Sequence, residues 1–316
     1  MRRACAAALL LLLTAAPARA WRLWGEPSDK KIRPVQALHD ANKAAEVVAA
    51  LTPQFMQTLR GTDLRQAYVL LGEDLFRLGR IDQALGVYQL GVQLFPKNVD
   101  LLTRQAGLLH AGSLDEQAKV LYRKALDLEP KHFGARLGLA EIDKALGFPD
   151  RAAAHYEVAL ETMEERPDVW RDYAEVLLAQ RQFKTAELAL ARTLALKTND
   201  PDALVLLAFV LRARGDHAGA IARLDGALAH GAGVGARRAK ALWLLEAGRL
   251  PEAEAEAAQI LAEVPGDAAA LWVRARTRLA AGQGVKACDD LTLAAGEPDN
   301  ARFSARAARA LCAGIR

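Results

Sequence analysis

Apolar positions along most of this chain follow a helical rhythm that glycine and proline interrupt at regular intervals. Tyr68, Leu71 and Leu75 are spaced by three and four residues, which predicts one face of an amphipathic helix. Gly79 ends that helix, because glycine adopts the left-handed conformation that follows many helix C-termini. The pattern therefore predicts a helix followed by a tight turn.

A second helix follows, with Ala84, Tyr88 and Gly91 on one face and Pro96 as its stop. The helix pair then recurs, and one alanine marks each copy at steps of 34, 34, 34, 34, 33 and 34 residues. The recurring alanines are Ala84, Ala118, Ala152, Ala186, Ala220, Ala253 and Ala287. Such a period predicts a stack of similar helix pairs. The glycines between the helices exclude a long coiled coil.

In period and in the positions just quoted, the chain resembles the tetratricopeptide repeat family. The resemblance implies an all-α fold, a right-handed α-solenoid of about seven helix-turn-helix repeats. The repeats are expected at residues 65–98, 99–132, 133–166, 167–200, 201–233, 234–267 and 268–301. The third repeat departs from the family pattern, because Arg136 and Asp143 stand where large apolar residues are usual.

The first helix of each repeat also carries a small residue at one position. These residues are Gly72, Ala106, Ala140, Ala174, Ala208, Ala241 and Ala275. We expect the two helices of a repeat to cross there with their backbones close together. A larger side chain should cost about 1–3 kcal/mol by overpacking.

Both ends of the array are expected to differ from the repeats. Within residues 21–64, Pro34 to Leu51 reads as one helix, and Thr52 caps a short helix beginning at Pro53, which gives a degenerate N-terminal helical pair. Residues 302–316 are expected to form a helix that caps the seventh repeat. The glycine-rich stretch 231–235 is either a hinge or an ordinary loop.

The resemblance also implies a binding surface. In this family, set positions on the first helix of each repeat line a concave groove that holds a peptide or helix of a partner. Carried over, those positions are Val69, Glu73, Phe76, Arg77, Thr103, Gly107, His110, Leu137, Glu141, Lys144, Arg171, Glu175, Leu178, Val205, Phe209, Arg212, Arg238, Leu242, Leu245, Trp272, Arg276 and Leu279.

The lysine–asparagine carboxylate clamp of chaperone-binding members is not expected, because Val69, Glu73 and Arg77 stand at its positions in the first repeat. The surface instead becomes more apolar and gains arginines toward the C-terminus, a composition typical of interaction hot spots. Alternatively, some of these side chains pack against neighbouring repeats and leave a shallower groove.

The first twenty residues read as an export signal. Arg2 and Arg3 precede the apolar run 4–16, and Ala18-Arg19-Ala20 predicts cleavage before Trp21. An uncleaved anchor is the alternative, but the run is shorter than the ~20 residues that span a bilayer. We therefore expect a periplasmic or secreted protein with no membrane insertion of the mature chain.

Removing this leader changes the charge argument. The formal net charge is +4, and three of the positive charges lie in residues 1–20, so the mature chain carries +1. Export and this small charge disfavour a nucleic acid partner. Cys288 and Cys312 remain after cleavage; they are a candidate disulfide in an oxidising compartment, with buried free thiols as the alternative.

No catalytic or metal-binding pattern is evident in the sequence. The six histidines are scattered without a pair at ligand spacing, and no serine stands in a nucleophile motif. We expect no enzyme activity and no cofactor. The sequence favours a non-enzymatic scaffold of the cell envelope that binds a protein partner. An accessory subunit of an envelope enzyme complex, in polysaccharide synthesis or secretion or in cytochrome maturation, is the alternative.

Overall fold

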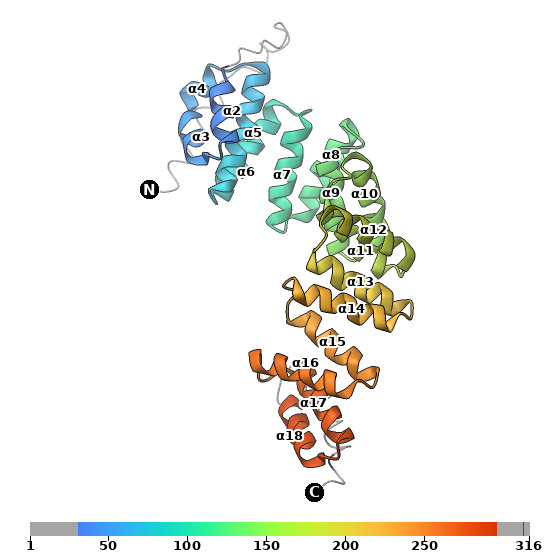
Figure 1. Ribbon diagram of the computed structural model, residues 1–316. Helices are drawn as coiled ribbons and strands as arrows, with labels where there is room; N and C mark the ends of the chain where they lie inside the picture. The colour runs from blue at the N-terminus through green and yellow to red at the C-terminus, as the bar shows by residue number, and fades with distance from the viewer. Residues whose placement is uncertain (1–30, 296–311, 313–316) are drawn as a thin grey trace. The chain divides into compact units, whose positions relative to one another are not determined.

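The computed structural model describes residues 31–295 and residue 312. That part of the chain folds into helices without a strand, which confirms the all-α class and the repeat solenoid (Figure 1). The chain divides into two units, Met1–Met163 and Glu164–Arg316. The predicted leader 1–20, residues 21–30, the end of the seventh repeat and, apart from Cys312, the capping helix 302–316 lie outside the described residues.

The first unit contains the N-terminal helices and the first three repeats. Its helices are α2 (Arg33–Asp40), α3 (Ala44–Ala50), α4 (Pro53–Gln57), α5 (Gly61–Arg77), α6 (Ile81–Leu94), α7 (Val99–Ala111), α8 (Asp115–Leu128), α9 (Phe133–Ala145) and α10 (Pro149–Thr162).

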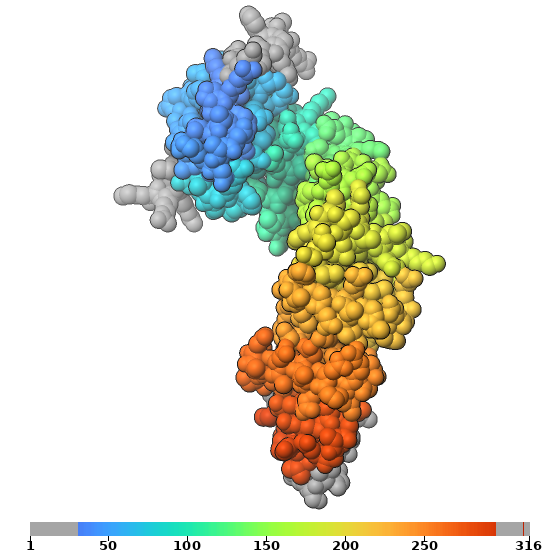
Figure 2. Space-filling model, viewed as in Figure 1, coloured from blue at the N-terminus to red at the C-terminus, as the bar shows by residue number. Residues whose placement is uncertain are grey.

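The second unit contains the last four repeats. Its helices are α11 (Pro167–Ala179), α12 (Phe183–Leu196), α13 (Pro201–Ala213), α14 (His217–Ala229), α15 (Val234–Glu246), α16 (Leu250–Glu263), α17 (Ala268–Ala280) and α18 (Gly284–Ala295). Within this unit the helix pairs follow one another in chain order, as the colour sequence from yellow to red shows (Figure 2). We call the first helix of each repeat helix A and the second helix B.

The small residues lie where the helices of a repeat meet. All seven recurring alanines of helix B are 0% exposed. Gly72 shows how close the approach is, because a Cβ atom built there would lie 2.2 Å from Cε1 of Tyr88. Buried tyrosines such as Tyr88 and Tyr122 fill the space beside these positions, and burial raises the pKa of both hydroxyls far above the ordinary value. The expected close crossing of the paired helices is therefore present.

Two local predictions are confirmed and one is wrong. Gly79 has φ +71° after helix α5, and the Thr52 hydroxyl accepts a 3.2 Å hydrogen bond from the Phe55 N–H at the start of α4. The helix expected from Pro34 to Leu51 is instead two helices, α2 and α3. Asn42 separates them at φ 57°, a left-handed conformation that asparagine tolerates better than most residues.

The glycine-rich stretch 231–235 lies inside the second unit and runs from the turn after α14 into the first two residues of α15. Gly231 has φ 90°, and Gly233 stands at the N-cap of α15 without a side chain to cap it. The boundary between the two units lies elsewhere, between Met163 and Glu164.

Cys288 on α18 and Cys312 are joined by a disulfide, with their Cα atoms 5.7 Å apart. The two cysteines are 24 residues apart in the sequence, and the bond ties Cys312 to α18 of the seventh repeat.

Candidate partner-binding site

An aromatic and arginine cluster joins two neighbouring A helices of the second unit. The Phe209 ring on α13 meets the Trp243 ring on α15 edge to face, with centroids 5.1 Å apart and an interplanar angle of 83°. The Arg212 guanidinium lies 4.7 Å from the Trp243 ring centroid and forms an ion pair with Glu246. We call these four residues the Phe209 cluster.

The Phe209 cluster combines a buried tryptophan ring with an exposed phenylalanine ring. Trp243 is 6% exposed, whereas Phe209 is 45% exposed although it contacts Trp243. The contacts with Trp243 and the ion pair to Glu246 hold Phe209 and Arg212 in place before any partner arrives. Such a cluster has the aromatic and arginine chemistry of interaction hot spots.

Sequence reasoning selected Phe209 and Arg212 but missed Trp243. The carried-over positions of the sixth repeat gave Leu242 in its place, one residue earlier. The step between these two repeats is 33 residues, so Leu242 is the true counterpart of Phe209, and the repeat pattern gave no signal for Trp243.

A second aromatic–cation pair lies on α17, where the Arg276 guanidinium is 5.7 Å from the Trp272 ring centroid. Both residues were predicted to line the groove. Trp272 is half-buried against the core of the seventh repeat, whereas Arg276 is exposed.

Two predicted groove arginines are instead part of the junctions between repeats. Arg171 lies 3.3 Å from the Asp200 carboxylate, and Arg238 donates to Asp267 at 2.5 Å. Asp200 and Asp267 are buried. Each accepts a 2.9 Å hydrogen bond from the first turn of the next A helix: Asp200 from the Ala203 N–H and Asp267 from the Ala270 N–H. The chain's own carboxylates engage both guanidinium groups, and the assignment of Arg171 and Arg238 to a partner surface stays a prediction.

The interactions at this junction lower the pKa of the Asp200 carboxyl. Burial raises its pKa, but the hydrogen bonds from Lys197 and the Ala203 N–H, together with the charge of Arg171, outweigh burial and hold the pKa below the ordinary value. The ionised carboxylate therefore stabilises the fold.

In the first unit, the N-terminal helix α2 engages the predicted positions on α5. His39 on α2 lies 2.8 Å from Asp74 and 3.4 Å from Glu73, and Arg77 donates to Asp74 at 3.1 Å. Glu73 also forms an ion pair with Arg104 on α7. Val69 is 7% exposed and belongs to the core of this unit, so its assignment to an open surface is wrong.

The other predicted residues differ in exposure. Phe76 and Glu141 are exposed, whereas Leu137, Leu178, Val205, Leu242 and Leu245 are half-buried. Val205, Leu242 and Leu245 pack against the core of the second unit. Among the apolar side chains at the predicted positions of the second unit, Phe209 is the most exposed.

Residues 31–295 and Cys312 hold no group of three or more histidine, cysteine, aspartate or glutamate side chains arranged to bind a metal ion. Among the same residues, no helix is both long and apolar enough to cross a membrane.

Comparison with known proteins supports the repeat assignment. A tetratricopeptide repeat model matches residues 145–208, and the model of anaphase-promoting complex, cyclosome, subunit 3 matches residues 179–260. Tetratricopeptide repeat protein 8 of Caenorhabditis elegans is 29% identical over 150 residues, which are 47% of this chain and 29% of that protein. The chain therefore matches less than a third of the length of this relative.

Solved structures share the fold. PilW, a type IV pilus biogenesis factor, has a TM-score of 0.57 at 19% identity, covering 64% of this chain and 94% of that chain. A tetratricopeptide repeat protein from Parabacteroides merdae has a TM-score of 0.51 at 15% identity, covering 89% and 95% of the two chains. Helix pairs, period and structural likeness agree that the chain folds as a tetratricopeptide repeat solenoid, and the tetratricopeptide repeat model matches the part of it at residues 145–208.

Proposed function

We propose that this protein is a non-enzymatic scaffold whose second unit binds a segment of a partner protein at the Phe209 cluster. Tetratricopeptide repeat folds in general serve protein–protein interaction. The observation that carries the proposal is the exposed Phe209 ring fixed on buried Trp243, beside an arginine held by an ion pair.

The geometry indicates what the partner segment supplies. A fully covered phenylalanine buries on the order of 200 Å². Since Phe209 is 45% exposed, about 90 Å² remains to be covered, which corresponds to about 2 kcal/mol. An apolar side chain of the partner would cover the ring. A partner carboxylate would compete with Glu246 for Arg212, whose side chain is 32% exposed.

Site-specific crosslinking in the native cells tests this proposal. A photoreactive phenylalanine analogue replaces Phe209 in one variant and Leu188 in a control. Leu188 is a matched control because it is 72% exposed on α12, a helix B of the same unit. We expect one protein, crosslinked through one segment, at position 209 and not at 188. The same crosslinks at both positions would refute the proposal.

The affinity of the identified segment then gives the magnitude. Phe209→Ala should weaken binding roughly tenfold to thirtyfold, as the loss of about 2 kcal/mol implies. Leu188→Ala should leave the affinity unchanged. Since Phe209 is half exposed, the melting temperature of the alanine variant should change little.

We also propose that the protein acts in the cell envelope after removal of residues 1–20. The basic start, the short apolar run and the Ala18-Arg19-Ala20 pattern support export. Mass spectrometry of the protein purified from its native cells should find Trp21 at the N-terminus. A cytoplasmic fraction that retains residues 1–20 would contradict this proposal.

A further inference from the structure

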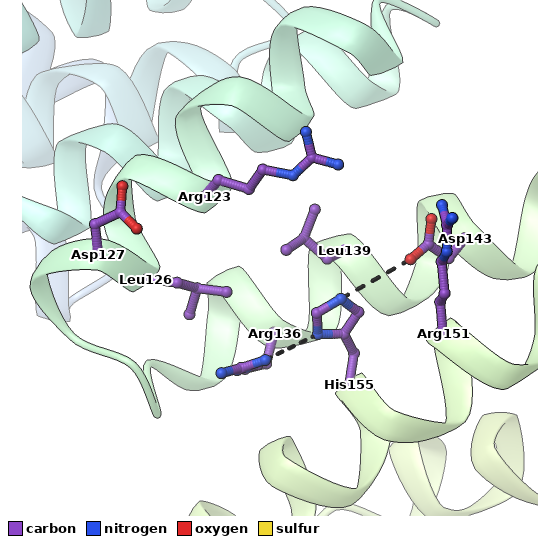
Figure 3. Close-up of a pocket in the computed structure, with 8 residues that line it drawn as sticks. All are labelled: Arg123, Leu126, Asp127, Arg136, Leu139, Asp143, Arg151 and His155. Atoms are coloured by element: carbon purple, nitrogen blue, oxygen red, sulfur yellow. Dashed lines mark hydrogen bonds and ion pairs between the residues drawn. The ribbon is translucent and has the colours of Figure 1, made fainter.

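A polar cleft of about 480 Å³ lies among helices α8, α9 and α10 of the first unit (Figure 3). Its lining residues are Arg123, Leu126, Asp127, Arg136, Leu139, Asp143, Arg151 and His155. These residues belong to the first unit, and they share none with the Phe209 cluster of the second unit.

The cleft exists because the third repeat replaces two core side chains by charged ones. Leu102 and Leu109 in the second repeat are 0% and 4% exposed. The residues 34 positions later are Arg136 and Asp143. A guanidinium and a carboxylate do not seal a repeat junction as two leucines do, so this junction stays open and polar.

Hydrogen bonds hold Arg136 and His155 in one arrangement. Arg136 donates from Nε to the Pro130 carbonyl at 2.9 Å, and its guanidinium lies 3.1 Å from Nδ1 of His155. Arginine only donates, so Nδ1 accepts and the neutral ring carries its proton on Nε2. That atom lies 3.9 Å from the Asp143 carboxylate.

Positive charge is in excess around the cleft. Burial lowers the pKa of His155, the charges of Arg136 and Arg123 lower it further, and Asp143 only partly opposes them. The imidazole is therefore neutral at pH 7. Three guanidinium groups then face two carboxylates, those of Asp127 and Asp143.

Two of the three arginines are available to a ligand. Arg123 and Arg151 are exposed, and neither forms an ion pair with a residue that the structure describes. Arg151 rests against the Phe148 ring at 4.9 Å from its centroid. Arg123 and the Arg136–His155 pair lie on opposite sides of the cleft, with Leu139 between them (Figure 3).

We propose that this cleft binds an oxyanion, a phosphate or carboxylate group, among the guanidinium groups of Arg123, Arg136 and Arg151. Guanidinium groups suit this ligand because their planar N–H donors match the oxygens of both groups. Leu126 and Leu139 provide an apolar wall that reduces screening by water, and an interaction between charges is stronger there.

The test measures the pKa of His155 in the full chain, by NMR of its ring protons, at increasing concentrations of inorganic phosphate. His155→Gln identifies the resonance. A bound oxyanion offsets the positive field of Arg123 and Arg136 and favours the imidazolium, so the pKa of His155 should rise. Asp127, Asp143 and Arg151 are the other charged groups of the cleft.

Arg123→Gln/Arg151→Gln should weaken phosphate binding roughly tenfold or more, because it removes hydrogen bonds to a charged group. Both arginines are exposed, so the helix content of the variant should be unchanged. Arg80→Gln removes an exposed arginine of the same unit outside the cleft, and this control should bind as the wild type does. Equal binding by the double variant would overturn the proposal.

A second titration distinguishes the source of the oxyanion. A blocked diglutamate peptide that binds more tightly than phosphate identifies an acidic side chain of a partner as the ligand. Tighter binding of phosphate identifies a free or small-molecule phosphate. If neither probe shifts the His155 pKa at millimolar concentration, the cleft is not an oxyanion site.

Discussion

Replacing Gly72 by alanine tests the close crossing of paired helices on which the whole array depends. A Cβ atom at Gly72 would lie 2.2 Å from Cε1 and 2.4 Å from Cζ of Tyr88. Gly86 on α6 is the matched control, because a Cβ atom there meets no atom within 4 Å. Both glycines lie inside helices of the same repeat.

Comparing Gly72→Ala with Gly86→Ala separates the steric cost of the added Cβ atom from the helix propensity of alanine. Alanine favours a helix interior over glycine by about 0.8–1.0 kcal/mol, and this gain applies to both variants. Gly86→Ala should therefore stabilise the first repeat by roughly that amount. Gly72→Ala carries in addition the overpacking cost of about 1–3 kcal/mol, so it should be less stable than Gly86→Ala by that difference.

Hydrogen exchange with mass spectrometry measures this difference locally, in peptides from α5 and α6. Protection should rise in Gly86→Ala and fall below it in Gly72→Ala. Shortening the facing side chain in a Gly72→Ala/Tyr88→Leu variant should cost less than the two single effects together, since the larger Cβ then has room. Equal protection in the two glycine variants would refute the packing argument.

Three further predictions concern the junctions and the C-terminus. Because the fold lowers the pKa of Asp200, the ionised carboxylate should stabilise the protein at neutral pH, and this stabilisation should be lost as the pH falls through the lowered pKa. The difference in unfolding free energy between wild type and Asp200→Asn, measured by urea unfolding, should therefore shrink on acidification. A wild-type advantage that is independent of pH would contradict this assignment. Asp267→Ala should cost about 0.5–2 kcal/mol through the lost cap on α17, whereas Asp267→Asn should keep most of the cap, as thermal unfolding of the two variants would show. Cys288→Ser should destabilise the seventh repeat by about 3 kcal/mol in the chain-entropy model. Hydrogen exchange in α17 and α18 measures this loss, and unchanged protection there would show that the bond contributes nothing to stability.

The sequence predicted the repeat architecture well, because the features that specify it are local and repeated. The recurring alanines and the small residues of helix A had to be buried in any stack of this period, and they are. Asn42 was missed for a physical reason. An apolar stripe on either side of it fits one helix as well as two, and only the left-handed backbone at Asn42 distinguishes them.

The candidate site was less predictable, because exposure depends on what each side chain contacts. Arg171 and Arg238 stand at groove positions, but nothing at those positions alone reveals the aspartates 29 residues later that pair with them. Val69 is apolar in either setting, so its residue type does not distinguish core from surface. In contrast, the charged pair Arg136 and Asp143 was visible as a departure from the pattern, and the structure shows the cleft that it opens.

The placement of Asp200 affects what happens if the number of repeats changes. This aspartate is the last residue of the fourth repeat, yet its side chain caps α13, the first helix of the fifth. Deleting residues 201–233 would join Asp200 directly to Val234, giving α15 the side-chain cap that Gly233 cannot provide. Loss of this whole repeat would thus leave α15 with a side-chain cap at the new junction.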